Sequence, residues 1–115
     1  MAKQFVLYNL KDDVKEEDFI KWVNEYKGPF VVGLSAVKRY TVTSVKRAMQ
    51  SKGGPPEVVD PPYKIAAVLE LTSVADYTKN QESKPYKEEF MPQFVKWVKG
   101  FLILQADEVW DQESK

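Results

Sequence analysis

The sequence predicts an α+β protein with a ferredoxin-like βαββαβ order, in which two helices lie on one face of a four-stranded antiparallel sheet. Two observations lead to this expectation. The segment Phe19–Val23 (FIKWV) returns as Phe94–Val98 (FVKWV), and each copy is followed by a glycine and a Phe-led apolar run. A strand-like segment also precedes each copy, so the chain consists of two similar strand–helix halves. Its 115 residues suffice for one domain, expected to span residues 1–115.

The first half contains a strand and a helix. Residues 4–10 are rich in Val, Tyr and Leu, which predicts strand one. Asp13 and Glu16 have the spacing of a capping box and therefore predict the start of the first helix. Apolar residues then recur at helical spacing, at Phe19, Trp22, Val23 and Tyr26. Gly28 is expected to end this helix, since Pro29 opposes its continuation.

Two further strands follow, separated by a segment rich in glycine and proline. β-branched, alternating residues over 37–45 predict strand two, and the apolar run over 63–71 predicts strand three. Residues 50–62 contain Gly-Gly-Pro-Pro and a second Pro-Pro pair. Such a composition predicts an irregular loop.

The second helical region and the last strand complete the pattern. Ser73, with an aspartate three residues later, resembles a capping box and starts the helical region. The region is interrupted near 81–85 and is expected to end at Gly100. Strand four is then expected over 101–110, followed by a frayed tail over 111–115.

Composition excludes several classes of function. The chain has 17 basic and 17 acidic residues and a formal net charge of zero, so no nucleic-acid partner and no membrane partner is expected. It contains neither cysteine nor histidine, which removes disulfides, thiolate nucleophiles and the commonest metal ligands. No metal site and no cofactor is predicted. With no signal-peptide pattern and no long apolar run, a cytoplasmic location is expected.

The faces of the predicted sheet are unusual. The odd positions of strand three are apolar and are expected to face the helices, but Ala66 and Val68 make the other face apolar as well. Strand one is apolar on both faces too, with Phe5 and Leu7 on one face and Val6, Tyr8 and Leu10 on the other. Since an antiparallel sheet with one solvated face should alternate more clearly, something is expected to cover this second face. A second copy of the chain is the simplest cover, which predicts a homodimer with its sheets packed face to face.

The charges on the outer strands suggest how two copies meet. Strand two carries only basic charges, at Lys38, Arg39, Lys46 and Arg47. The last strand and the tail carry acids, at Asp107, Glu108, Asp111 and Glu113. If these edges meet across a dimer, opposite charges pair and the homodimer weakens at high salt. The alternative is that both are solvated edges, guarded by charge against aggregation.

Several segments carry a resemblance to a known family. They are Val6–Lys11, Val14, Glu17–Phe19 and Trp22, then Pro61–Tyr63, Glu70–Leu71, Ser73 and Tyr77. This pattern resembles the RedY-like (HapK-like) proteins, which are associated with prodiginine pigment biosynthesis, and it covers most of the first eighty residues. The resemblance implies a dimeric α/β barrel with a small-molecule cavity between sheet and helices. The wider superfamily includes monooxygenases, cyclases, isomerases and stress-responsive barrels.

Two residues are candidates for catalysis. Glu70 lies on the even face of strand three, where a dimeric barrel would enclose it, and a desolvated carboxylate there serves as a base. The alternative is a strand-end glutamate in water, as most glutamates are. Tyr8 ends strand one near the expected cavity mouth and is the second acid–base candidate.

Six residues are candidates for ligand binding. They are Asn9, Trp22, Tyr26, Arg39, Tyr40 and Trp97. The aromatic members can form the walls of a cavity for a planar ligand, although aromatic residues at helical spacing more often pack in the core. Arg39 can pair with Glu70 or bind an anionic ligand, or it can be an ordinary edge charge. Asn9 can contact a ligand or close a turn.

Two hypotheses of function remain open at this stage. The first is a dimeric barrel that binds a small molecule and acts as a cofactor-independent enzyme on an aromatic or polyketide-like substrate. The second is a non-catalytic binding or stress-related homodimer whose barrel is filled with side chains. Cavity volume separates the two hypotheses. A pocket of roughly 300 Å3 or more lined by Glu70 and Tyr8 would support the first, and an interior packed solid with Glu70 on the surface would exclude an enzyme.

Overall fold

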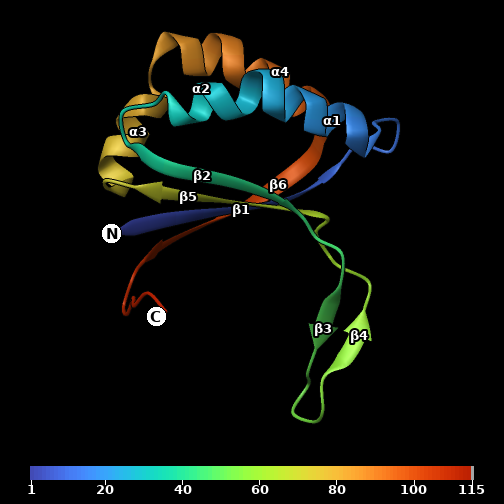
Figure 1. The fold of residues 1–115 in the computed structure, drawn as a ribbon. Coiled ribbons are helices and arrows are strands. Elements are labelled where there is room, and N and C mark those ends of the chain that lie inside the picture. Colours follow the sequence, from blue (N-terminus) through green and yellow to red (C-terminus); the bar gives the residue numbers. More distant parts are fainter. Residues whose placement is uncertain (115) are drawn as a thin grey trace.

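The computed structural model describes residues 1–114. Helices and sheet form two layers, and a two-stranded arm extends away from them (Figure 1). The strands of the main sheet are β1 (Ala2–Leu10), β2 (Val37–Ser44), β5 (Ile65–Leu71) and β6 (Val98–Asp107). The helical segments are α1 (Glu16–Trp22), η1 (Val23–Lys27), α2 (Gly28–Val32), α3 (Val74–Gln81), η2 (Pro85–Phe90) and α4 (Met91–Trp97).

The main sheet has the strand order β2-β5-β1-β6, and each neighbouring pair is antiparallel. All helices lie on one face of it (Figure 1). This confirms the predicted ferredoxin-like α+β fold, because the two strand–helix halves place β1 and β5 at the centre and β2 and β6 at the edges. The boundaries of β1, β2 and β5 agree with the predicted strands to within two residues, whereas β6 begins and ends three residues earlier than expected.

The first helix does not end at Gly28 as predicted. The chain passes from α1 into a π-helical turn, η1, and continues through α2. In this wide turn the amide of Gly28 donates to the carbonyl oxygen of Val23, five residues earlier. A Cβ on Gly28 would lie 2.9 Å from that oxygen, so glycine permits the close approach. Pro29, which has no amide hydrogen, fits the first turn after the π-helical turn.

The predicted capping boxes have different outcomes. The box at Asp13 is wrong, because α1 begins after Lys15 and no side chain caps it. Glu16 instead accepts a 2.5 Å hydrogen bond from the hydroxyl of Ser44, which ties the helix to β2. The box at Ser73 is confirmed, since its hydroxyl accepts a hydrogen bond from the amide of Asp76.

Gly100 was expected to end the second helical region, but it lies within β6. The helix ends at Trp97 and passes directly into the strand at Val98. Gly100 has a φ of +154° and lies opposite Asn9, next to an irregularity in the β1–β6 ladder. It therefore serves the strand rather than the helix end.

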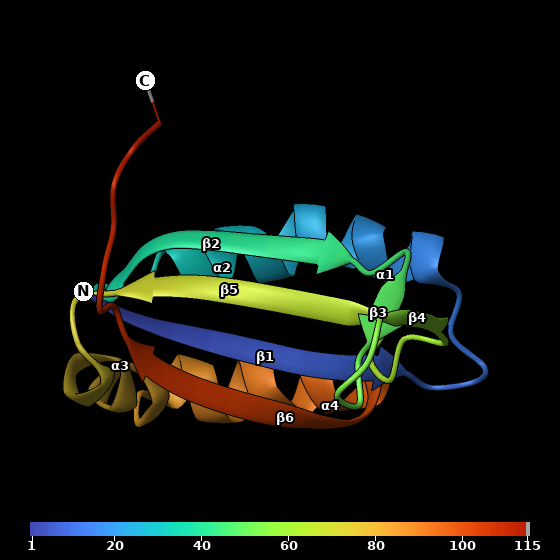
Figure 2. The same ribbon diagram turned by 90° about the horizontal axis from the view of Figure 1, so that it is seen from below.

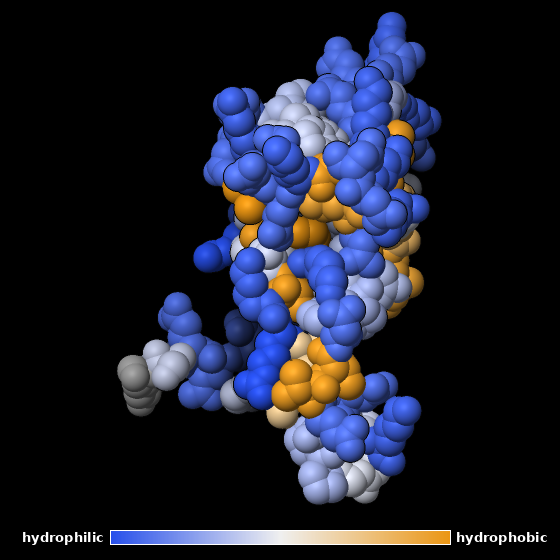
Figure 3. Space-filling view, turned by 90° about the vertical axis from the view of Figure 1, so that its right-hand side faces the viewer, coloured by the Kyte–Doolittle hydropathy of each residue, from blue (hydrophilic) through white to orange (hydrophobic). Residues whose placement is uncertain are grey.

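The segment predicted to be an irregular loop, 50–62, is partly regular. β3 (Ala48–Gln50) pairs with β4 (Glu57–Val59) to form the arm that projects from the body in Figure 1. Gly53, at its tip, has a φ of +96° and supplies the turn. Met49 and Val58 on the arm are more than half exposed, and Figure 3 shows apolar surface there.

Residues 111–114 have no regular structure and are exposed, while Lys115, also part of the predicted tail, lies outside the described residues. Within residues 1–114, no helix has the length and apolar character needed to cross a membrane.

The core lies between the sheet and the helices. Ile65, Ala67, Leu69 and Leu71 of β5 are buried there, as the alternation predicts, and pack with aromatic residues such as Phe19. The opposite face of the sheet carries no helix and is open in Figure 2. Its centre is apolar, with Phe5, Leu7, Ala66, Val68, Leu102 and Leu104 paired across three strands.

Candidate functional site: a cavity beside a buried lysine

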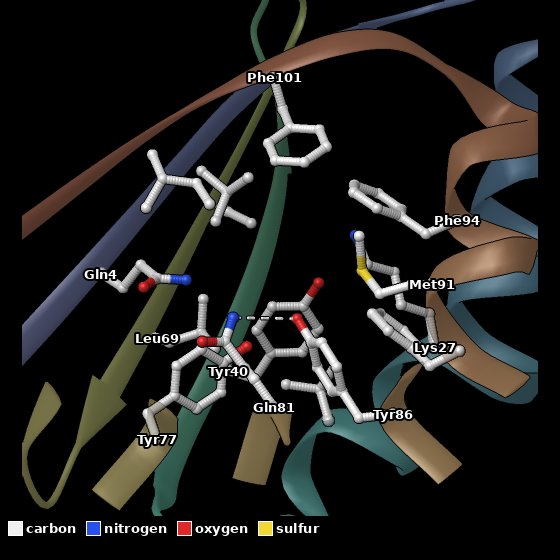
Figure 4. Close-up of a pocket in the computed structure, with 15 residues that line it drawn as sticks. Gln4, Lys27, Tyr40, Leu69, Tyr77, Gln81, Tyr86, Met91, Phe94 and Phe101 are labelled. Carbon is white, nitrogen blue, oxygen red and sulfur yellow. Dashed lines mark hydrogen bonds between the residues drawn. The ribbon is translucent and has the colours of Figure 1, made fainter. Parts of the chain in front are cut away.

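A cavity of about 210 Å3 lies between the inner face of the sheet and the helices (Figure 4). Its walls are mostly aromatic and aliphatic, with Leu69 from the sheet and Phe94 from the helical layer. Towards β6 it is bounded by Phe101 and Ile103, which remain 41% and 38% exposed because the helices do not cover this edge completely. The cavity is therefore closest to solvent along β6.

Lys27 is the only charged residue among those that line the cavity in the described chain. It is 4% exposed, and its Nζ donates a 2.8 Å hydrogen bond to the hydroxyl of Tyr8. Around this amine lie the rings of Phe94, Tyr8, Phe19 and Tyr40, with centroids 4.2, 4.8, 5.5 and 5.8 Å away. No carboxylate of residues 1–114 forms an ion pair with it. Burial lowers the pKa of Lys27 from its ordinary 10.5 to about 7.

The π-helical turn explains why a lysine points into the core. Phe19, Lys27 and Val31 are the buried residues of the continuous first helix. The wide turn adds one residue to the repeat, so Lys27 faces the sheet while Tyr26 is only half-buried. The lysine stem spans the apolar layer, and its amine reaches Tyr8 on β1.

Tyr8, one of the two predicted catalytic residues, is fully buried on the inner face of β1. Its ring meets Phe19 and Phe94 edge-on, at centroid distances of 5.9 and 5.2 Å. Burial raises the pKa of Tyr8 well above its usual value, so the hydroxyl stays protonated across the neutral range. Tyr8 thus reaches the cavity through its hydrogen bond to Lys27.

Other polar groups along the cavity are mostly paired with each other. Gln105 donates a 3.0 Å hydrogen bond to the side chain of the buried Gln4. Gln81 donates a 3.2 Å hydrogen bond to the hydroxyl of Tyr86, drawn as a dashed line in Figure 4. Tyr40, a predicted ligand-binding residue, also lines the cavity, and burial raises the pKa of its hydroxyl. The walls thus present neutral polar groups and one amine.

Glu70, the other predicted catalytic residue, lies on the opposite face of the sheet. It is opposite Lys3 on β1 and Arg39 on β2, and the three residues border a shallow depression on the open face. Because side chains alternate along β5, Glu70 cannot share the helix-side cavity with Tyr8. Arg39 and Glu70 are neighbours in register, but within residues 1–114 no ion pair joins them.

Asn9 connects two segments distant in sequence. Its side-chain amide donates a 2.9 Å hydrogen bond to the carbonyl oxygen of Pro62, and its side-chain oxygen accepts a 2.8 Å hydrogen bond from the amide of Lys64. Both polar ends are thereby used in joining β1 to the chain that enters β5. Asn9 holds this junction together at the end of the sheet, away from the cavity.

The remaining predicted ligand-binding residues form an aromatic stack between the two helices. Trp22 lies against Trp97 and Tyr26 with ring centroids 5.5 and 5.7 Å apart. The indole N–H of Trp22 donates a 3.3 Å hydrogen bond to the side chain of Gln93. These three aromatic residues join the halves of the helical layer and do not line the cavity.

Lys27 was not among the candidates from the sequence, although a signal for it exists. It follows Phe19 and Val23 at intervals of four residues, so it continues an apolar helical stripe. Lys27 lies within the predicted helix, but a lysine near a helix end normally points to solvent. In the part of the chain that the structure describes, acidic residues form no cluster of three or more suited to a metal ion.

A comparison with protein-family models decides the family. The model of the REDY-like protein HapK matches residues 2–110. The chain belongs to the HapK family of REDY-like proteins. This confirms the family resemblance in the sequence. Among curated proteins, no sequence matches this HapK-family chain.

Several solved structures share the fold of this chain. HapK from Hahella chejuensis is similar with a TM-score of 0.76 and 16% identity, covering 100% of this chain and 99% of that one. A dimeric ferredoxin-like protein of unknown function from Thermobifida fusca has a TM-score of 0.64 and 14% identity, with 91% and 88% covered. A hydroxynitrile lyase from Passiflora edulis has a TM-score of 0.65 and 16% identity, with 96% of both chains covered. At these identities the likenesses show the fold of this HapK-family protein.

Proposed function

We propose that this HapK-family protein binds a small, largely apolar molecule in the cavity beside Lys27. The observation that carries the proposal is an interior space of about 210 Å3 with aromatic walls and a single buried amine. A dry cavity of roughly 150 Å3 in another protein is enough to hold benzene. The space here therefore suits one substituted aromatic ring, and a longer polyketide-like molecule fits only if it extends past Phe101 and Ile103 at the β6 edge.

The cavity also supports cofactor-independent acid–base chemistry. An amine with a pKa of about 7 is partly neutral at neutral pH and can accept a proton from a bound substrate. Tyr8, 2.8 Å away and protonated, can donate a hydrogen bond to an oxygen that gains negative charge. Glu70 has no part in this scheme. The hydroxynitrile lyase with the same fold is consistent with an enzyme function, but it does not identify this protein's substrate.

We further propose that the protein is a homodimer through the open face of its sheet. That face is apolar at its centre, where Leu102 and Leu104 are 41% and 47% exposed. The Thermobifida fusca protein is described as dimeric, as is a similar protein from Bacteroides fragilis. Large exposed apolar patches commonly mark association surfaces. This contact would leave the helix-side cavity of each protomer free for a ligand.

A ligand titration tests the proposed cavity function. Ala67 lines the cavity and is buried, so Ala67→Leu fills part of the space that a ligand needs. We expect benzyl alcohol to bind the wild type and to bind this variant at least about tenfold more weakly, because the leucine side chain occupies space that the ligand needs. Chemical shifts of methyl groups at the cavity in NMR spectra give the affinity.

Ala75→Leu is the matched control, since Ala75 is exposed on α3. It is expected to keep wild-type affinity. Equal affinities in all three proteins would place the ligand elsewhere and contradict the proposal. No binding to the wild type, for benzyl alcohol, indole and phenol alike, would favour the alternative of a non-catalytic homodimer with a filled interior.

A further inference from the structure

We propose that Lys27 is a nucleophile that captures a small apolar aldehyde or ketone as a Schiff base within the cavity between the sheet and the helices. The inference rests on the proposed function, since a carbonyl compound must first enter that cavity. It goes further by assigning a covalent role to one amine and a chemical class to the ligand.

The surroundings of the amine favour its neutral, nucleophilic form. Lys27 is 4% exposed, and the four rings around it come from β1, β2, α1 and α4. Its one hydrogen-bond partner, Tyr8, carries no charge, and no other charged residue of the described chain lines the cavity. Removing an ammonium group from water without an anionic partner disfavours its charge, and the pKa of Lys27 falls accordingly to about 7. A solvated lysine is by contrast almost entirely protonated at this pH.

The same surroundings favour an uncharged carbonyl ligand over an anion. A carboxylate or phosphate would find one amine and a few neutral polar groups, mostly paired with each other, among apolar side chains, so most of its lost hydration would remain uncompensated. An aromatic aldehyde or ketone loses little hydration on entering, and its ring can pack against the aromatic walls. Phe94, whose ring is 4.2 Å from Nζ, lies where such a ring can be held next to the amine.

The proposed reaction needs no external oxidant or reductant. The lone pair of Nζ attacks the carbonyl carbon, an N–C bond forms, and the carbonyl π electrons move to oxygen. Tyr8 Oη, 2.8 Å from Nζ, passes a proton from nitrogen to that oxygen, which gives a neutral carbinolamine. The nitrogen lone pair then forms the C=N bond as the C–O bond breaks. The hydroxyl group takes up the remaining N–H proton and leaves as water. Amine and carbonyl thus become imine and water.

Reductive trapping tests this assignment. The full-length protein is incubated with benzaldehyde and cyanoborohydride at pH 7.4, and the sites of benzylation are located by peptide mass spectrometry. We expect Lys27 to be modified roughly 10- to 100-fold faster than any exposed lysine, since a larger neutral fraction outweighs the lower nucleophilicity of a less basic amine. The rate at Lys27 should follow a titration with a midpoint near its pKa of about 7.

Four variants control the experiment. Lys27→Met and Lys27→Arg should abolish the fast modification. One replacement is apolar and the other is charged, so that if one variant fails to fold the other can be used, and circular dichroism shows which variant is folded. Lys21→Met removes an exposed lysine from the same helix and should leave the fast phase unchanged. Tyr8→Phe keeps the ring and should slow trapping several-fold while Lys27 remains the modified residue.

Benzyl alcohol, which has no carbonyl group, separates the failure of this inference from the failure of the proposed function. Competition by benzyl alcohol together with a Lys27 adduct supports both. Benzyl alcohol binding in the cavity without a Lys27 adduct overturns the Schiff base and leaves the binding function standing. Modification spread over exposed lysines, unchanged in Lys27→Arg, also overturns it. If benzyl alcohol does not bind and no Lys27 adduct forms, both proposals are wrong.

Discussion

A buried lysine without an anionic partner destabilises a protein unless its charge is lost. Lys27 lies among aromatic side chains with the hydroxyl of Tyr8 as its hydrogen-bond partner. A leucine or methionine at this position would pack as well and would carry no desolvation penalty. The presence of an amine at the wall of a cavity is therefore better explained by chemistry than by stability.

Lys27 should make stability depend on pH in a defined window. Its pKa is about 7 in the folded state and 10.5 when solvated, so the unfolded chain binds more protons between these values. The free energy of unfolding should therefore rise with pH from about 7 to about 10, by about 1.4 kcal/mol per pH unit at most. Urea denaturation at several pH values measures this slope.

The variant Lys27→Met should remove that rise, whereas Lys21→Met should retain it. Above pH 10 the trend should reverse, because burial raises the pKa values of Tyr8, Tyr40 and Tyr77 in the folded state. Their ionisation then favours the unfolded chain. A flat profile in the wild type between pH 7 and 10 would show that the amine of Lys27 is solvated.

At the level of single residues, the sequence predicted two side chains that lie at this cavity. Tyr8 was proposed as a polar group at a strand end, and Tyr40 as one of the aromatic walls. Glu70 was assigned to the even face of the third predicted strand, and it lies there, on the face that the helices do not cover. Its enclosure by a second sheet stays a prediction. Lys27 was missed because a lysine at the end of an amphipathic helix normally points to solvent.

Among the elements, the π-helical turn η1 has the largest effect on the site. Without the extra residue in this turn, the side chain of Lys27 would point away from the sheet. Pro29, which has no amide hydrogen, would then lie inside a regular α-helix instead of in the first turn of α2. Strands were predicted well because alternation reports directly on burial. Helix ends were predicted less well, since Gly28 and Gly100 have the same local signal as helix-ending glycines but serve a wide turn and a strand.

Gly28→Ala tests the close contact within that turn. The added Cβ would lie 2.9 Å from the carbonyl oxygen of Val23, which is backbone and cannot move aside easily. We expect a loss of about 1–2 kcal/mol in the free energy of unfolding, although alanine is otherwise favoured in helices. Gly54→Ala in the arm meets no atom within 4 Å and should change stability by less than about 0.5 kcal/mol. Thermal denaturation of both variants makes the comparison, and equal stabilities would contradict it.

At the scale of the whole molecule, the chain has one covered and one open sheet face. Val68 lies at the centre of the open face and Val95 is exposed on α4, on the other side of the molecule. If the open face forms the dimer, Val68→Glu should weaken association at least about tenfold, because it buries an unpaired charge. Val95→Glu should leave association unchanged. Sedimentation of both variants over a concentration range measures the effect, and a monomeric wild type would contradict the dimer.

Salt dependence reports on the edges of the same dimer. If the basic β2 of one copy lies beside the acidic end of β6 of the other, the dimer should weaken as salt rises. Within one chain, Glu108 Oε1 already lies 3.7 Å from Lys3 Nζ. In such a dimer Glu108 would therefore either exchange this ion pair for one with β2 of the other copy or form both. If the dissociation constant of the wild-type dimer does not change with salt, the ion pairs at the edges contribute little, and the apolar centre of the face provides the free energy of association.

The position of β1 at the centre of the sheet has a consequence for folding kinetics. β1 pairs with β5 and β6, and the ladder that joins Ala2 to Asp107 closes a loop of nearly the whole described chain. Contacts of such high sequence separation slow folding, because the entropy of loop closure is lost before the contacts form. The apolar strand β1 can complete its pairing only after β5 and β6 have been synthesised, whereas β2, the arm and β5 can form a hairpin of lower contact order. β1 is therefore the strand of the sheet that is most exposed to misassociation while the chain folds.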